Sequence, residues 1–481
     1  MGGLARSMGF RLIQLLPLDE TAPGELSPYS AMSVAAIDPS YLALEGLGGI
    51  DDAAVAQARA AIHDESRDLA RYRTTKLNLL DLAFRHFRDN ASAADRGASD
   101  QFAHDNADWL PDYALFRALK EKYHWSPWQE WPQALQRREP AALADSSREL
   151  ARPIEFYSWL QFIAHRQWVA ARAELARHGV LLGGDMAFSP GHESAEVWTN
   201  QELFDLQRTV GAPPDAFTPA GQRWGLPMPN WPRMRERGYA FTRMRVRRAR
   251  QLFDLLRIDH VVGLYRTFSY GLAADSKGEF YPLDEPAQLG HGEEVIGAIM
   301  REAGDMAIIA EDLGTVPPFV RRSLTGFGIP GYKVMRWEKD WNSPHPRYLR
   351  PSEYSEISLA TTGTHDTEPL AEWWRELPLD ERREFVETLQ LQGLDWHAKA
   401  LDERGLDAIL TALYGAPSRY AFLPIQDAFG WDERINTPGT LSNANWTWRL
   451  PFQLEQAIAT PSIAARAKAL KAIAVRTGRD S

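Results

Sequence analysis

The 481-residue sequence predicts an α/β fold, a (β/α)8 TIM-type barrel whose first strand is missing and which carries a helical insertion subdomain. Two observations predict this fold. Short apolar runs typical of buried strands alternate with helical segments, and several of these runs end in an acidic residue. The expected strands lie near 11–18, 180–188, 255–261, 306–313, 332–338, 358–366 and 420–429. Their alternation with helices indicates a parallel sheet with right-handed crossovers.

The number of expected strands is one short of a closed barrel, which needs eight. The first run begins at residue 11, so we expect the first strand and most of its helix to be absent from this chain. The alternative is an open, doubly wound sheet of seven strands. We expect one catalytic barrel domain over 1–481, with a helical insertion at 50–150. We also expect a long cleft loop at 189–230, because that segment is rich in Gly and Pro and has little periodicity.

Composition excludes several classes of protein. The formal charge is −10, from 54 basic and 64 acidic residues, and the basic residues are scattered, which argues against nucleic-acid or anionic-membrane partners. The absence of cysteine excludes disulfides and thiolate sites. No apolar run approaches the ~20 residues of a membrane span. The first residues have no secretory h-region, so the expected location is the cytoplasm.

Three expected strands end in an acid: LLRID at Asp259, MAIIAED at Glu311 and SLATTGTHD at Asp366. The carboxyl ends of parallel barrel strands are where active sites are built. Three carboxylates gathered there suit cleavage of a glycosidic bond by a retaining mechanism. Any one of these acids alone could instead be a helix N-cap or a loop salt bridge, but the three together favour catalysis.

The residues near these acids suit different roles. Arg257 lies on the same strand face as Asp259 and can keep that nucleophile ionised. Glu311 must be protonated to act as the acid, through partial burial and anionic neighbours. Asp366 can hold ring hydroxyls and stabilise the oxocarbenium-like transition state.

Two histidines flank the acids. His260 and His365 could be metal ligands, but no third ligand sits at a recognised spacing, so we expect hydrogen bonding to sugar hydroxyls and no metal site. The 17 tryptophans exceed the usual content, and flat amphipathic rings suit the apolar faces of sugars.

The sequence resembles the 4-alpha-glucanotransferases (amylomaltases, or disproportionating enzymes) of the alpha-amylase-like glycosidases. The matching stretches run in family order to about residue 451 and include LIQLLPL, SPYSAMS, GGDMAF, GAPPDAFTPAGQRWGLP, LLRIDHVVG, IIAEDLG, TGTHDTEP and INTPGTLSNANWTWRLP. The combination of GQRWG, RIDH, AEDLG and TGTHD is highly specific.

This resemblance implies transfer of an alpha-1,4-glucan segment from one maltooligosaccharide or glucan to another, or to glucose. It implies Asp259 as nucleophile, Glu311 as acid/base and Asp366 as transition-state stabiliser. The implied substrate-binding residues are Tyr29, Asp185, Asp215, Gln222, Trp224, Arg257, His365 and Asn436. No metal or organic cofactor is implied, and the sequence is silent on oligomeric state.

The sequence also departs from the family pattern. The opening strand is missing, TGTHDTEP lacks the commoner asparagine–aspartate continuation, and AIDPS replaces a glycine–asparagine–proline stretch. These departures suggest a divergent subgroup. Two alternatives therefore stay open: an alpha-glucan hydrolase on the same site, and an inactive, truncated glucan-binding form.

Overall fold

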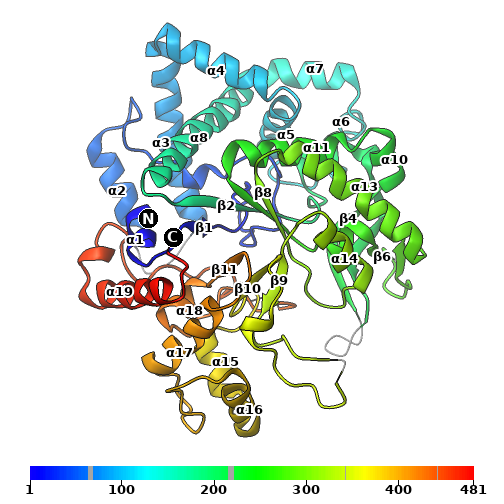
Figure 1. Ribbon diagram of the computed structural model, residues 1–481. Coiled ribbons are helices and arrows are strands. Elements are labelled where there is room, and N and C mark those ends of the chain that lie inside the picture. Colours follow the sequence, from blue (N-terminus) through cyan, green and yellow to red (C-terminus); the bar gives the residue numbers. More distant parts are fainter. Residues whose placement is uncertain (63–68, 215–220, 342, 441, 481) are drawn as a thin grey trace.

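The protein is built on a parallel sheet (Figure 1). The computed structural model describes residues 1–62, 69–214, 221–341, 343–440 and 442–480. Within them, seven parallel strands pair in chain order: β1 (Leu12–Gln14), β2 (Leu181–Met186), β5 (Leu255–Ile258), β8 (Ala307–Ala310), β9 (Gly331–Val334), β10 (Ser358–Thr361) and β11 (Tyr420–Phe422). The order never reverses, which rules out a doubly wound sheet. The predicted TIM-type architecture is confirmed, with β1 and β11 as the outer strands in the described chain.

The strands are shorter than the sequence predicts. The last expected strand, 420–429, is wrong beyond β11, because Ile425–Phe429 forms helix α18. Pro424 precedes this helix; a proline has no N–H to donate to a sheet, and its fixed φ suits a helix start. The expected strand 358–366 likewise ends at Thr361, and its remaining residues form the loop that carries Asp366.

Helices cover the sheet and fill the chain between β1 and β2. Those between β1 and β2 are α2 (Asp52–Ile62), α3 (Leu69–Asn90), α4 (Ala93–Asp105), α5 (Leu110–Lys122), α6 (Gln133–Gln136), α7 (Pro140–Glu149) and α8 (Ala151–Arg177). Helices between the later strands include α11 (Ala240–Leu252), α13 (Glu285–Ala303), α14 (Pro318–Gly326) and α17 (Glu403–Tyr414). The others are α1 (Gly2–Ser7), α9 (Ala195–Thr199), α10 (Trp231–Glu236), α12 (Val262–Tyr265), α15 (Leu370–Glu376), α16 (Leu379–Leu389) and α19 (Pro461–Arg476). In Figure 1, helices α3 to α8 lie together on one side of the sheet, and α1 packs against α19 near both termini.

The segment 189–230 is not the loop that its composition predicts. It contains α9 and two strands of a second, antiparallel sheet, whose order is β4 (Gln222–Pro229), β3 (Phe204–Ala212), β6 (Thr267–Gly271) and β7 (Glu279–Tyr281). Glycine is required where β3 meets β4, because a Cβ at Gly211 would lie 1.8 Å from the Gln222 carbonyl oxygen. The small sheet brings β4 to the side of the cleft described below.

The register of the parallel sheet sets the positions of the site residues. Asp185 on β2 pairs with Arg257 on β5, and Ile258 on β5 pairs with Ala310 on β8. The next residues along β5 and β8 are Asp259 and Glu311, which therefore leave the same edge of the sheet side by side. No helix in the described chain has both the length and the apolar character that a bilayer crossing requires.

Candidate active site

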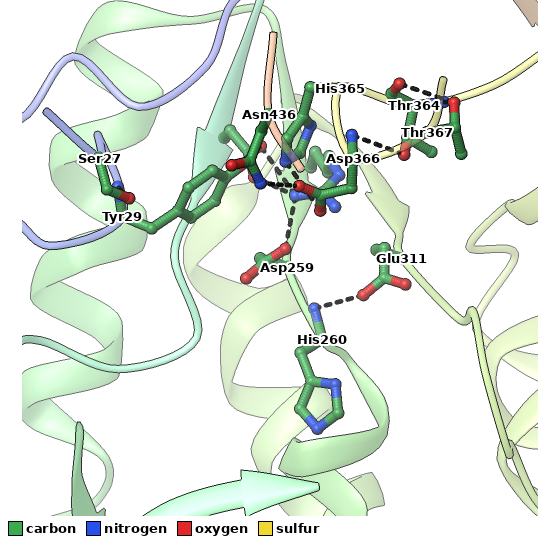
Figure 2. A network of polar contacts seen from close by, with 12 residues as sticks. Ser27, Tyr29, Asp259, His260, Glu311, Thr364, His365, Asp366, Thr367 and Asn436 are labelled. Atoms are coloured by element: carbon green, nitrogen blue, oxygen red, sulfur yellow. Dashed lines mark hydrogen bonds and ion pairs between the residues drawn. The ribbon is translucent and has the colours of Figure 1, made fainter. Parts of the chain in front are cut away.

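The carboxyl edge of the sheet gathers the three predicted catalytic acids (Figure 2). Asp259 follows β5 and Glu311 follows β8 directly, whereas Asp366 lies in the loop after β10. All three line one cleft with a volume of about 1510 Å³, and so do Tyr29 and Arg257. The structure thus brings together three acids that are spread over more than a hundred residues of the sequence.

Arg257 lies between the carboxylates of Asp185 and Asp259. Its Nη1 lies 2.8 Å from both carboxylate oxygens of Asp185 and 2.8 Å from Oδ1 of Asp259. Burial acts to lower the pKa of this guanidinium, but the two carboxylates raise it well above its ordinary value. The Asp259 side chain is 24% exposed, so one side of it is open to the cleft while the other is held by a fixed cation. This arrangement fixes the orientation of the Asp259 carboxylate at the cleft.

Glu311 has the opposite electrostatic setting. Its Oε2 accepts a 2.8 Å hydrogen bond from the His260 N–H, and its Oε1 accepts one of 3.0 Å from the Leu313 N–H. Burial nevertheless raises the pKa of the Glu311 carboxyl to about 7; Asp259 adds to this rise and Arg257 opposes it. A carboxyl that titrates near neutrality can both give and take a proton.

His260 serves this site through its backbone. Its φ of 46° lies in the left-handed region, which is strained for a residue with a side chain. In Figure 2 its N–H points at Glu311 while the imidazole turns away. The ring packs edge-on against Trp224 and Phe188, and burial lowers its pKa to about 4. Sequence reasoning considered only the side chain of His260, so it missed this backbone role.

Asp366 is held as an anion by two side chains. Its Oδ1 accepts a 2.6 Å hydrogen bond from Asn436 Nδ2, and its Oδ2 lies 3.2 Å from His365 Nε2. Burial acts to raise the pKa of Asp366, but these partners outweigh burial, so that the net shift is below the ordinary value. Asp366 is therefore ionised when Glu311 carries its proton.

Tyr29 connects the Arg257 and Asp366 sides of the site. Its hydroxyl donates a 2.7 Å hydrogen bond to Asp185 Oδ2, and its ring stacks on His365 with centroids 5.3 Å apart and planes at 19°. Burial raises the pKa of the Tyr29 hydroxyl well above its ordinary value, so it remains a donor.

Two further groups of residues line the cleft. The first group, on β4, includes Gln222 and Trp224, and the Trp224 indole Nε1 donates a 3.1 Å hydrogen bond to the Gln222 amide oxygen. Asp215, the remaining predicted binding residue, lies outside the described residues. The second group follows β9 and includes two tryptophans that sequence reasoning did not single out: Trp337, 45% exposed, and Trp341, 69% exposed. The signal for them was the pair of tryptophans in WEKDW, directly after the β9 strand.

No metal-binding cluster is apparent in the part of the chain that the structure describes: no three or more His, Cys, Asp or Glu side chains there are grouped so that they could hold a metal ion. His260 and His365 are instead engaged with the ring and carboxylate neighbours given above.

Comparison with known proteins gives consistent matches along nearly the whole chain. The 4-alpha-glucanotransferase family matches residues 1–455. The chain is 33% identical over 461 residues to the 4-alpha-glucanotransferase of Thermus thermophilus, covering 92% of this chain and 88% of that protein. It is 30% identical over 465 residues to the 4-alpha-glucanotransferase of Chlamydia pneumoniae, covering 94% and 86%.

A solved structure agrees with these relatives. The amylomaltase from Streptococcus agalactiae in complex with acarbose matches with a TM-score of 0.86 at 27% identity, over 99% of this chain and 94% of that one. The strand order, the acids at the carboxyl edge and the family match thus agree, and the chain belongs to the 4-alpha-glucanotransferase family.

Proposed function

We propose that this enzyme is a retaining 4-alpha-glucanotransferase, which moves an alpha-1,4-glucan segment from one maltooligosaccharide or glucan to another, or to glucose. The observation that carries the proposal is the contrast between two neighbouring carboxyls. Asp259 is held by the buried Arg257 cation, whereas burial raises the pKa of Glu311 to about 7. A carboxylate oriented by a fixed cation, beside a carboxyl that titrates near neutrality, suits the nucleophile and acid roles of a retaining site.

In the first step, an Asp259 oxygen attacks the anomeric carbon of the donor as the bond to the leaving oxygen breaks. Glu311 gives its proton to that oxygen, and the shortened glucan departs. Asp366 stabilises the positive charge that develops on the sugar ring, and it can do so because Asn436 and His365 keep it ionised. The product of this step is a glycosyl-Asp259 ester.

In the second step, the 4-hydroxyl of an acceptor sugar replaces the leaving group beside Glu311. The Glu311 carboxylate takes the hydroxyl proton, the acceptor oxygen attacks the anomeric carbon, and Asp259 is released as a carboxylate. A pKa near 7 suits Glu311 to both steps. Two inversions at one carbon retain the alpha configuration.

The substrate class follows from the cleft and the relatives. The Streptococcus agalactiae amylomaltase is solved with acarbose, and the curated relatives are named 4-alpha-glucanotransferases. In this chain the cleft that holds the acids is also lined by Trp224 and Trp337. Such aromatic walls suit the apolar faces of glucose units, which supports a glucan acceptor held in place of water.

The test is chromatography of the products formed from pure maltotriose. We expect glucose together with maltooligosaccharides longer than maltotriose, and no such ladder from Asp259→Asn. Glucose and maltose without longer products would make the enzyme a hydrolase. If the folded protein gave no products from maltotriose, the inactive glucan-binding form would be the remaining alternative.

The acid role has its own test. Glu311→Gln cannot protonate a leaving sugar oxygen, so transfer from maltotriose should fall by about a hundredfold or more. An alpha-glucosyl fluoride needs little help in leaving, and it should restore the first step in this variant. The absence of any rescue would remove Glu311 from the acid role.

A further inference from the structure

The residue Trp446 combines a strained backbone with a place beside the site. Its φ of 63° lies in the left-handed region, where a bulky side chain is a genuine outlier. Such strain persists only where the surroundings impose it, and it concentrates at functional positions. Here the Trp446 N–H donates a 2.8 Å hydrogen bond to the Ile435 carbonyl oxygen.

The neighbouring Asn445 reinforces this turn. It is buried, its Oδ1 accepts a 3.1 Å hydrogen bond from the Thr437 N–H, and its Nδ2 donates one of 3.1 Å to the Thr440 carbonyl oxygen. The bond to Ile435 and the bond to Thr437 flank Asn436, which holds Asp366. The strained turn is therefore tied to the chain on both sides of a residue that contacts a catalytic acid.

The Trp446 ring reaches two further residues of the site. Its centroid lies 5.8 Å from that of Tyr29 and 5.7 Å from that of His365, and these two rings stack on each other. Tyr29 bonds to Asp185 and His365 contacts Asp366. The half-buried indole thus supports both groups without itself lining the cleft.

We infer that Trp446 is a positioning residue of the active site, whose ring fixes Tyr29 and His365 and whose left-handed backbone is retained because it presents the ring there. This inference rests on the proposed function. A reacting group that moves by about 1 Å can lose a hundredfold in rate, so loss of the ring should act on the chemical step.

The test separates the ring from the backbone with three variants. Trp446→Ala removes the ring and keeps the strain, Trp446→Gly removes both, and Trp446→Phe keeps an aromatic ring. We expect kcat for maltotriose to fall about a hundredfold in both the alanine and the glycine variants, with KM changed less than threefold. The phenylalanine variant should stay within about threefold of the wild type.

The thermal stability of these variants should instead depend on the backbone strain at position 446. The glycine variant should unfold at a higher temperature than the alanine variant, because glycine adopts positive φ without strain. Gln390→Gly is the matched control: Gln390 has a φ of 56° at the exposed end of α16, away from the cleft. It should also gain stability, with kcat unchanged.

Two results would overturn the inference. One is a glycine variant that keeps more than a third of the wild-type kcat. The other is a crystal structure of that variant in which Tyr29 and His365 remain stacked as before; this readout does not depend on turnover. A wild-type enzyme without transfer activity would defeat the proposed function, and the crystal structure would still decide whether Trp446 positions the two rings.

Discussion

Replacing Glu311 by glutamine should stabilise the protein at alkaline pH while it removes activity. In the folded protein, burial raises the pKa of Glu311 from its ordinary value of 4.5 to about 7. Between these two values the folded state holds a proton that the unfolded state has released. The free energy of unfolding of the wild type therefore falls as the pH rises from 4.5 through about 7. Glutamine does not titrate, so the variant escapes this loss.

The size of the effect follows from the two pKa values. A difference between 4.5 and about 7, at about 1.36 kcal/mol per pKa unit, corresponds to about 3 kcal/mol. The free energy of unfolding of Glu311→Gln, relative to that of the wild type, should therefore increase by this amount between pH 4.5 and pH 8. For a chain of 481 residues the unfolding entropy is roughly 1 kcal/mol/K. The difference in Tm between Glu311→Gln and the wild type should therefore grow by about 3 °C over this pH range.

The assay is urea and thermal unfolding of both proteins at several pH values in this range. Asp366→Asn is the control, because folding lowers the pKa of Asp366 whereas it raises that of Glu311. Asp366 stabilises the folded protein at pH values above its unfolded-state pKa of 3.8. This stabilisation is lost only as the pH falls through the lower pKa of the folded state. The stability difference of the control should therefore stay flat from pH 5 to pH 8. An equally flat difference for Glu311→Gln would refute the reasoning.

Three further predictions concern binding and the pH profile. Arg257→Lys keeps the charge but replaces a rigid, planar guanidinium, whose Nη1 contacts two carboxylates, by an ammonium on a flexible chain. We expect kcat for maltotriose to fall about a hundredfold with the circular dichroism unchanged. Asn436→Asp places a second carboxyl 2.6 Å from Asp366, which should raise the pKa of Asp366 and move the acidic limb of the activity profile to higher pH. Trp341→Ala should lower kcat/KM about tenfold for maltoheptaose as acceptor and leave glucose unaffected, whereas the exposed Leu283→Ala, outside the cleft, should change neither.

The positions of Asp259 and Glu311 could be predicted from the sequence because a parallel sheet has a single carboxyl edge. Once LLRID and MAIIAED are assigned as strands, Asp259 and Glu311 must leave that edge, and their separation in the chain does not matter. The Arg257 contact with Asp259 also follows from the two-residue repeat of a strand. The contact between Asn436 and Asp366 has no such local signal and could be expected only through the family resemblance.

The second sheet could not be predicted because its stability comes from distant pairing. Strand β4 contains Gly225, Pro227 and Pro229, which weaken the alternating pattern of a strand. It is held by β3, which in turn pairs with β6 more than fifty residues further along the chain. Local composition therefore indicated a loop, and tertiary pairing overrode it.

Two of the features that sequence reasoning missed share one physical property: each opposes the stability of the fold. These are the positive φ angles of His260 and Trp446. The burial of Glu311, which the sequence analysis expected, has the same property because it disfavours the charged form of the carboxyl. Local preferences fail at such positions because a functional geometry is imposed by the rest of the structure. The opposite signs expected for Glu311→Gln, more stable at high pH and less active, follow from this property. A residue with a purely structural role would lose stability and activity together, so a gain in stability joined to a loss of activity distinguishes a residue whose geometry serves the proposed catalysis.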